Sequence, residues 1–380
     1  MKILFCTNAF ENVTNGPVRF ANIILEINEL FPQHQLHVLT EDVSEHRLEA
    51  LRYVHKVRLA IPRWLKPLGQ IARWFIYYRH IKALEKTFDF DILVFINSFN
   101  GTWASLRSRK PTVGMINDEK NMLATWRNFD GSGLWLKRFT FQQFERLSAR
   151  KHRLIIANSE FLRQRIIKTY HLPPHKVQKL YKSIPLDGIV FQPHRAFGEV
   201  IKILFVKADF RVGELPTLVQ ALRQLTEYRF LLTVVGPEPW FEQQVRTIGE
   251  GIPHLTFDYV GPQPQDKVYE YMRSYDIFCV PSYTEAFGVA NIEALAHGLS
   301  VVSSHVGGIP EVLDGGRNGW LVPPRDANAL AEALKECIVR QDLRLQKATN
   351  GRTFIEKFSK DEMLRNFVVM LQETLHTTTK

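Results

Sequence analysis

The sequence predicts an α/β protein of two domains, each built on a doubly wound parallel sheet. Its 380 residues exceed what one typical hydrophobic core serves. Short apolar runs of strand type alternate with segments of helical period. This alternation starts again after residues 184–198, where prolines and glycines indicate a linker. We therefore expect one domain over 1–190 and a second over 191–359, with the two sheets facing each other across a cleft.

The first domain opens with a strand over residues 2–6, a loop and an amphipathic helix. Ligands of such domains bind at the carboxyl ends of the strands, so Gly16 in this loop would bring backbone close to a substrate. An ordinary strand-to-helix turn explains Gly16 equally well. Further strands are expected at 35–39, 91–96, 111–116 and 154–158. Asn117 directly follows one of them, at the edge where an α/β active site lies.

The second domain repeats the pattern, with strands expected at 201–206, 230–235, 254–260, 276–280 and 300–303. A basic loop with Lys207 and Arg211 follows the first of these strands. The last helix, at about 360–376, is long enough to pack back onto the first domain. We therefore treat residues 360–380 as a separate unit.

The charge of the chain lies unevenly between its halves. Residues 1–190 hold 29 Lys and Arg against 16 Asp and Glu, whereas residues 191–380 hold 20 against 23. Within the basic half, residues 52–86 alternate basic and aromatic side chains, with Glu85 as their one acidic residue. From residue 70 the apolar residues recur at helical spacing. This pattern favours a helix on an anionic membrane surface, with packing inside the domain as the alternative and single-stranded nucleic acid least expected.

The remaining composition describes an ordinary soluble globular protein, with 45% apolar and 23% charged residues. No stretch approaches the roughly 20 apolar residues of a membrane span, and no secretory signal is visible. Cys6, Cys279 and Cys337 lie far apart in the chain, which argues against a disulfide framework or a metal cluster. We expect a cytoplasmic protein, with contact to the inner face of the membrane left open.

The most informative stretch is 281–298, which reads PSYTEAFGVANIEALAHG. Gly288 and Gly298 bracket a helix that is apolar almost all round, so Glu293 is expected in an enclosed place. Glu285 lies just before the helix N-terminus, whose free N–H groups suit a phosphate. Two carboxylates flanking a phosphate site fit a nucleotide-sugar. Alternatively, Glu285 merely favours the helix dipole and Glu293 pairs with an internal cation.

Residues 276–326 continue with VVSSHVGGIPEVL and NGWLVPPRD, and this whole region resembles the C-terminal domain of family 4 retaining glycosyltransferases of GT-B fold. The resemblance implies two Rossmann-like domains, with an acceptor bound by 1–190 and a nucleotide-sugar donor by 191–359. It implies that Glu285 accepts hydrogen bonds from the donor sugar and that Glu293 binds the ribose. It also implies that no cofactor or metal ion is needed.

Other donor-binding positions follow from the same resemblance. Backbone groups near the helix start would meet the sugar and the diphosphate, and a turn after an earlier strand would hold the base. These positions are Ala286, Phe287, Gly288 and Val289 for the first set and Gly261 and Pro262 for the second.

The sequence departs from the family pattern at three places. Ala208 stands where the family has an arginine, so Lys207 and Arg211 are the expected cations for the leaving diphosphate. Asn117 stands where a histidine is common, and its amide hydrogen-bonds but does not titrate. Gly16 stands alone where a pair of glycines is common.

The sequence therefore predicts a metal-independent, retaining glycosyltransferase that acts on a glycan or lipid-linked acceptor in cell-surface polysaccharide or glycolipid biosynthesis. We expect it to bind no nucleic acid. The alternative is a catalytically weak subunit that binds a nucleotide-sugar or glycan within an assembly complex.

Overall fold

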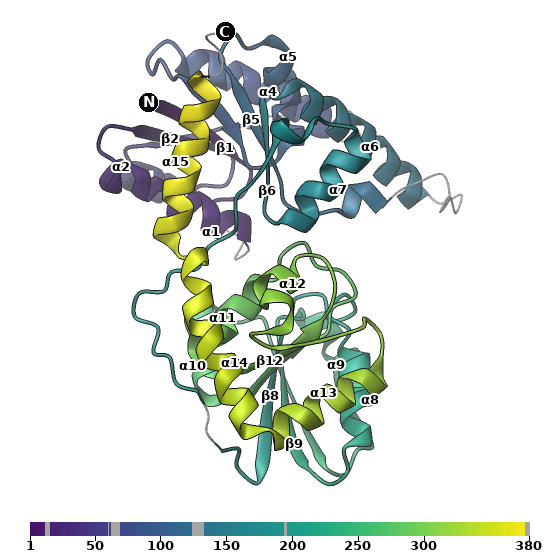
Figure 1. The fold of residues 1–380 in the computed structure, drawn as a ribbon. Helices are drawn as coiled ribbons and strands as arrows, with labels where there is room; N and C mark the ends of the chain where they lie inside the picture. The colour runs from purple at the N-terminus through teal and green to yellow at the C-terminus, as the bar shows by residue number, and fades with distance from the viewer. Residues whose placement is uncertain (12–15, 60, 62–68, 124–132, 194–195, 377–380) are drawn as a thin grey trace. The chain divides into compact units, whose positions relative to one another are not determined.

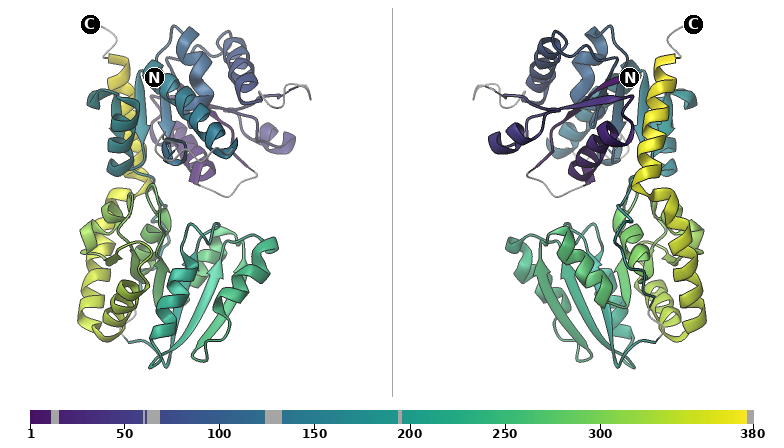
Figure 2. Two further views of the ribbon diagram at one scale, coloured as in Figure 1. Left: turned by 90° about the vertical axis from the view of Figure 1, so that its right-hand side faces the viewer. Right: turned by 90° about the vertical axis from the view of Figure 1, so that its left-hand side faces the viewer.

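The computed structural model describes residues 1–11, 16–59, 61, 69–123, 133–193 and 196–376. The chain forms two compact units (Figure 1). The first contains Met1–Lys182 together with Asp361–Lys380, and the second contains Ser183–Lys360. In each unit helices cover both faces of a sheet (Figure 2).

In the described residues of the first unit, seven parallel strands form a sheet in the order β3-β2-β1-β4-β5-β6-β7. Its strands are β1 (Lys2–Thr7), β2 (Gln35–Thr40), β3 (Val54–Lys56), β4 (Ile92–Phe95), β5 (Thr112–Ile116), β6 (Leu154–Ala157) and β7 (Val177–Lys179). Its α-helices are α1 (Gly16–Ile23), α2 (Ile27–Leu30), α3 (Glu45–Ala50), α4 (Gly69–Leu84), α5 (Thr102–Arg107), α6 (Gly133–Lys151), α7 (Glu160–Tyr170) and α15 (Lys360–His376).

Alternation along the strands of this sheet builds two cores. Ile3 and Phe5 of β1 point into a core that also contains Phe20 of α1 and Phe367 of α15. Their neighbour Leu4 points the other way, into a core formed with α4 and α5. Strands buried on both faces read as continuous apolar runs, which is why β1, β4, β5 and β6 stand out in the sequence. The last helix thus completes the core of the first unit although it ends the chain.

In the described residues of the second unit, six parallel strands are ordered β10-β9-β8-β11-β12-β13. These are β8 (Val200–Val206), β9 (Arg229–Val235), β10 (Leu255–Gly261), β11 (Ile277–Val280), β12 (Ser300–Ser304) and β13 (Trp320–Val322). The α-helices are α8 (Leu215–Gln224), α9 (Glu242–Gly249), α10 (Gln265–Ser274), α11 (Val289–His297), α12 (Ile309–Val312), α13 (Ala327–Val339) and α14 (Gln341–Phe354).

The order of this second sheet places a topological switch point between β8 and β11, where successive connections run to opposite sides. Ligands of open α/β sheets bind outside the carboxyl ends of the strands at such a point. The loops that follow β8 and β11 carry Lys207 and Glu285. The fold therefore brings residues far apart in the sequence to the edge where a ligand is expected.

Candidate functional site

Helix α11 is held between two glycines in the left-handed conformation. Gly288 caps its start with φ 92°, and Gly298 caps its end with φ 88°. The Gly298 N–H donates to the carbonyl of Leu295, and the Leu299 N–H donates to that of Ala294, at 3.1 Å each. Side chains rarely tolerate this backbone, so the two glycines fix where the helix begins and ends. The boundaries expected from the sequence are confirmed.

Lys207 and Glu285 meet just before α11. The Lys207 Nζ lies 2.5 Å from Glu285 Oε2, and the two side chains are 24% and 22% exposed. The other carboxylate oxygen, Oε1, accepts a bond of 3.4 Å from the Phe287 N–H. Lys207 directly follows β8, where its own N–H donates to the carbonyl of Val235 at 3.0 Å. One predicted cation and one predicted sugar-binding carboxylate thus form a single charged pair.

Two further glycines make this pairing possible through close backbone approach. Gly236 has φ 117°, and a Cβ there would lie 2.7 Å from the carbonyl carbon of Lys207. Gly307 has φ 56°, and a Cβ there would lie 1.6 Å from the carbonyl oxygen of Glu285. That same oxygen accepts a bond of 3.2 Å from the Gly308 N–H. The loop after β9 therefore packs against the Lys207 backbone, and the loop after β12 packs against the Glu285 backbone. Only glycine fits at these two contacts.

Glu293 lies inside α11 and is 4% exposed, which confirms the enclosed carboxylate expected from the sequence. Its Oε1 accepts bonds from the Gln265 Nε2 at 3.0 Å and from the Tyr269 hydroxyl at 3.2 Å. Both donors belong to α10. They are neutral groups, so the structure gives Glu293 amide and hydroxyl partners at this oxygen where the alternative interpretation expected a cation.

The predicted base turn closes β10. Gly261 is buried with φ 78°, and its carbonyl accepts a bond of 2.8 Å from the Gly236 N–H. Pro262 is exposed beside it. The turn is thus hydrogen-bonded to Gly236, the same glycine that packs against the Lys207 backbone. The Gly236–Gly261 hydrogen bond joins the loops after β9 and β10 at the carboxyl edge of the sheet. Helix α10 begins three residues after Pro262.

Arg211 lies elsewhere in its loop. Its guanidinium stacks on the rings of Phe210 and Phe241, 5.1 and 5.0 Å from their centroids, and donates to Gln244 Oε1 at 2.8 Å. These contacts hold Arg211 against α9, whereas Lys207 is held against Glu285. Of the two predicted cations, the structure pairs Lys207 with the candidate carboxylate.

A second ion pair joins the loop of Lys207 to the loop after β13, and a cation–π contact continues from there to the loop of Glu285. Glu214 and Arg325 are both non-glycine residues with positive φ, 57° and 60°. The Arg325 Nε donates to Glu214 Oε1 at 2.7 Å, and its guanidinium lies 4.2 Å from the ring centroid of Tyr283. Left-handed backbone at such residues costs energy and is held only where surroundings require it. This contact was not expected from the sequence.

In the first unit, Asn117 follows β5 as predicted. Its Nδ2 donates to the carbonyl of Ile96 at 2.7 Å, and its own carbonyl accepts from the Asn158 Nδ2 at 2.8 Å. Asn117 therefore links the carboxyl ends of three neighbouring strands, β4, β5 and β6, through its side-chain amide and its backbone carbonyl. Gly16 is the first residue of α1, and residues 12–15 before it lie outside the described residues.

A buried carboxyl lies close to this edge. Glu145 of α6 is 5% exposed and accepts a hydrogen bond from the Tyr170 hydroxyl. Burial, reinforced by the nearby charge of Asp118, raises the pKa of Glu145 to about 7. Asp118 directly follows Asn117, so a group that titrates near neutral pH lies beneath the predicted acceptor edge.

The basic segment 52–86 forms β3 and α4, while Arg63, Trp64 and Lys66 lie outside the described residues. In α4, Trp74, Tyr77 and Ile81 are buried, so this face of the helix packs inside the domain. Phe75 and Arg79 stay exposed. Acidic side chains from outside the segment neutralise part of its charge, because Glu41 and Glu45 pair with Arg73 and Lys56.

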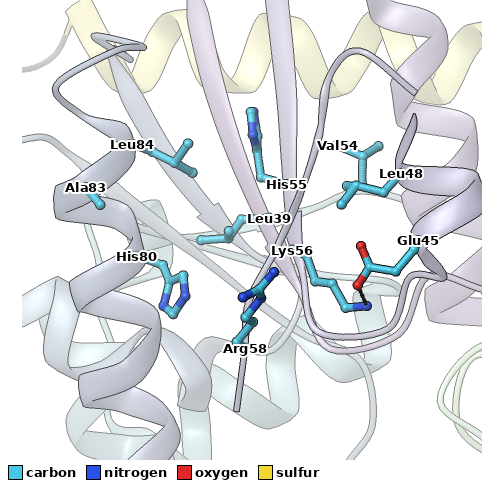
Figure 3. Close-up of a pocket in the computed structure, with 10 residues that line it drawn as sticks. All are labelled: Leu39, Glu45, Leu48, Val54, His55, Lys56, Arg58, His80, Ala83 and Leu84. Atoms are coloured by element: carbon cyan, nitrogen blue, oxygen red, sulfur yellow. Dashed lines mark hydrogen bonds and ion pairs between the residues drawn. The ribbon is translucent and has the colours of Figure 1, made fainter. Parts of the chain in front are cut away.

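A cavity of about 530 Å³ lies beside β3 (Figure 3). The Lys56–Glu45 ion pair lies on its α3 side, His80 projects from α4 on the other side, and Arg58 lies between them. This cavity is at the edge strand of the first sheet. None of the predicted site residues lines it.

Among the described residues, no helix is long and apolar enough to cross a bilayer. Within the same ranges, no three His, Cys, Asp or Glu side chains come together as metal ligands. The described cysteines Cys6, Cys279 and Cys337 are buried thiols.

Comparison with known proteins assigns both halves. Residues 189–354 match the family described as glycosyl transferases group 1, and residues 27–187 match the one described as glycosyltransferase family 4. The chain belongs to the family 4 glycosyltransferases. The resemblance seen at residues 276–326 is therefore confirmed, and the family assignment extends over the first half, where sequence motifs were weak.

Individual relatives agree with this family. The chain is 31% identical over 179 residues to the putative colanic acid biosynthesis glycosyltransferase WcaL of Salmonella typhimurium, a match that covers 45% of this chain and 44% of that protein. The first curated relatives are thus matched over less than half of their length.

Two solved structures share the fold. Sucrose-phosphate synthase from Thermosynechococcus elongatus superposes with a TM-score of 0.76 at 18% identity, covering 99% of both chains. HepE from Anabaena, solved in complex with UDP-glucose, gives a TM-score of 0.72 at 18% identity and covers 98% of this chain and all of that one. The predicted GT-B fold class is confirmed.

Proposed function

We propose that this family member is a retaining glycosyltransferase that uses a nucleotide diphosphate-sugar as donor and a glycan or lipid-linked compound as acceptor. The observation that carries the proposal is the arrangement around α11: Glu285 paired with Lys207 before its N-terminus, and Glu293 enclosed within it. The HepE structure with UDP-glucose supports the donor class, and the name of WcaL supports a role in cell-surface polysaccharide or glycolipid biosynthesis.

Each residue has a role in this proposal. Glu285 accepts hydrogen bonds from the donor sugar, and Glu293 accepts them from the ribose. The N-terminus of α11, with backbone N–H groups from Ala286 to Val289, faces the diphosphate, whose charge complements the helix dipole. Gly261 and Pro262 flank the base. Asn117 serves the acceptor side, in the domain that we assign to acceptor binding.

The Lys207–Glu285 pair suggests how the site is prepared for its donor. The ammonium and the carboxylate lie 2.5 Å apart and neutralise each other. When a nucleotide-sugar binds, the sugar hydroxyls donate hydrogen bonds to the Glu285 carboxylate, and the diphosphate replaces Glu285 as the ion-pair partner of Lys207. A lysine in this place supplies the positive charge that a metal ion supplies elsewhere, so we propose metal-independent transfer.

The transfer step needs no reactant other than the donor and the acceptor. The bond between the anomeric carbon and the β-phosphate oxygen breaks, and its electron pair stays on that oxygen, where Lys207, Arg211 and the helix N-terminus stabilise the charge. The acceptor oxygen forms the new bond from the same face of the sugar. Its proton passes to the departing diphosphate, and the anomeric configuration is retained.

We also propose contact with an anionic membrane surface through segment 52–86. Phe75, Arg79, Lys82 and Lys86 are exposed and recur at intervals of three and four residues, which places them along one side of α4 and its continuation. A basic stripe with one aromatic ring suits an anionic lipid surface. Flotation with vesicles containing anionic lipid should recover the wild type and lose the Arg79→Glu/Lys86→Glu variant. Wild-type protein that stays in solution would contradict this contact.

A panel of nucleotide-sugars tests the donor class. A ligand at about a hundred times its Kd adds about 2.7 kcal/mol, which corresponds to a rise in Tm of roughly 5–10 °C for a domain of about 150–250 residues, the size range of the second unit, Ser183–Lys360. UDP-, GDP- and ADP-sugars are compared by thermal unfolding. One base should raise the Tm strongly, and a flat response across the panel would contradict the proposal.

A second candidate, a catalytically weak binding subunit, has one observation in its favour. The Asn117 Nδ2 is already engaged by the Ile96 carbonyl at 2.7 Å, and an asparagine does not titrate. Release of free nucleoside diphosphate from a bound nucleotide-sugar distinguishes the two. An enzyme releases it slowly even without acceptor, whereas a binder raises its Tm with the donor and releases none.

A further inference from the structure

We infer that Gln265 and Tyr269 position the Glu293 carboxylate so that it discriminates the ribose 2′-hydroxyl, which makes these two residues part of the selection for ribonucleotide over deoxyribonucleotide donors. The inference rests on the proposed function, because it takes Glu293 as the ribose-binding carboxylate. It adds two positioning residues on a different helix and a selectivity that they control.

The contacts converge on a single oxygen. The Gln265 Nε2 and the Tyr269 hydroxyl both donate to Glu293 Oε1, at 3.0 and 3.2 Å, from positions four residues apart on α10. Residues at this spacing lie on the same side of a helix. Two donors on one oxygen fix the rotation of the carboxylate about its own axis, and they thereby set the direction in which the second oxygen points.

Tyr269 is itself held in place from α11. Its ring packs on the His297 imidazole with 4.8 Å between ring centroids. Burial lowers the pKa of His297, and its Nδ1 lies 2.8 Å from the Glu293 carbonyl, an acceptor, so that nitrogen carries the proton. The Tyr269 ring, the imidazole and the Glu293 backbone are therefore one contacting unit, which holds the Tyr269 hydroxyl beside the carboxylate.

Gln265 connects this unit to the expected base site. It is the first residue of α10, three residues after Pro262, and Gln263 between them donates to the Val260 carbonyl at 3.4 Å. A shift of the base turn would therefore move the donor that holds Glu293. This connection couples base and ribose recognition through the start of one helix.

The chemistry favours discrimination at the 2′ position. A carboxylate whose oxygens are oriented by fixed donors accepts well-aligned bonds from a diol, and a site built around a hydroxyl leaves a buried charge poorly satisfied when that hydroxyl is missing. A carboxylate that is free to rotate compensates for the missing partner. A protein with an oriented carboxylate and one with a rotating carboxylate should therefore differ mainly in the ratio of their affinities for the ribonucleotide and the deoxyribonucleotide. The affinity for the ribonucleotide itself should differ less.

The experiment measures that ratio by calorimetry on the full chain. UDP, GDP and ADP are titrated beside their 2′-deoxy counterparts. For the nucleotide that binds, the deoxy form should bind about 10- to 100-fold more weakly to the wild type, the range expected for a hydrogen bond to a charged group. The variant Gln265→Met/Tyr269→Phe keeps the side-chain volumes but lacks both donors. Its ratio should fall to within about threefold, the typical scatter of such contributions.

Controls on the same helix separate positioning from general damage. Lys267 pairs with Glu270 at 2.8 Å on the exposed side of α10, and Tyr271 packs on Tyr275, so Lys267→Met and Tyr271→Phe perturb α10 without touching Glu293. Both should keep the wild-type ratio. If the double variant unfolds, Tyr269→Phe alone removes one hydroxyl, and its ratio should lie between those of the wild type and Glu293→Gln.

The outcomes distinguish this inference from the proposed function. A ratio that collapses in Glu293→Gln but stays at the wild-type value in the variants of Gln265 and Tyr269 would overturn the inference alone. Equal weakening of both nucleotide forms in these variants would also overturn it, because that is the signature of a structural role. Failure of all three nucleotides to bind the wild type would overturn the proposed function and this inference with it.

Discussion

Gly307→Ala should disable the site by displacing the Glu285 backbone, without altering any side chain that is proposed to contact a ligand. The added Cβ would lie 1.6 Å from the carbonyl oxygen of Glu285, whereas real Cβ contacts stay beyond 3.0 Å, so the Glu285 backbone has to retreat by more than an ångström. The bond from the Gly308 N–H to that oxygen is disturbed as well. A displacement of about 1 Å at a reacting centre costs on the order of 100-fold in rate, so a loss of that size in kcat/KM is expected.

The matched control is Gly315→Ala. Gly315 has φ 63°, close to the 56° of Gly307, but a Cβ there meets nothing within 4 Å. Both variants carry the same left-handed alanine, which costs about 1–2 kcal/mol of stability. Urea unfolding measures that shared cost, and nucleotide-sugar turnover measures the rest. Gly315→Ala should keep its turnover, and a Gly307→Ala protein as active as Gly315→Ala would refute the role given to the Gly307–Glu285 contact.

Two further predictions concern charged groups. Lys207→Met should lower kcat by about 100- to 1,000-fold, as expected for loss of one group that stabilises developing charge. Arg211→Met should lower kcat by less than about tenfold, because Phe210, Phe241 and Gln244 hold Arg211 against α9. Equal losses of kcat in the two variants, measured by steady-state kinetics, would contradict this order. Burial raises the pKa of Glu145 from 4.5 to about 7, so its contribution to stability is present below about pH 4.5 and is lost as the pH rises through about 7. Glu145→Gln should therefore gain up to about 3 kcal/mol over the wild type between pH 5 and pH 8 in urea unfolding, and parallel stability curves would contradict the raised pKa.

The sequence was sufficient for the long elements of the fold. Strands β1, β4, β5 and β11 are buried along almost their whole length and β8 is largely apolar, and the bounds of these strands agree with expectation to within about a residue. The strands that sequence reasoning missed are β3, β7 and β13, which are three residues each. All three are outer strands of their sheets, and a run of three residues is too short to show a period of two.

Some residues of the candidate site could likewise be predicted from the sequence, and others could not. Glu285, Glu293, Gly288 and Gly298 were recognisable because they belong to one continuous stretch with cap and helix signals. Gln265 was not, because a glutamine at a helix start carries no signal until the contact of α10 with α11 is known.

Close backbone contacts were equally hidden. Gly236 and Gly307 are ordinary loop glycines in the sequence, and their need for an absent Cβ depends on Lys207 and Glu285, about 30 and 20 residues away. Segment 52–86 shows the opposite error: its acidic partners Glu41 and Glu45 precede it, so its local charge overstated the exposed charge. In each case the deciding contact joins segments that are distant in the chain.

The most direct measurement of the central claim is the release of nucleoside diphosphate from the nucleotide-sugar that stabilises the protein, in the wild type and in Glu285→Ala. Proton NMR of the freed sugar at early times gives its anomeric configuration in the same reaction. We predict release by the wild type with retained configuration, and none by Glu285→Ala although that variant keeps its fold. Equal release by both proteins, or release with inverted configuration, would contradict the account.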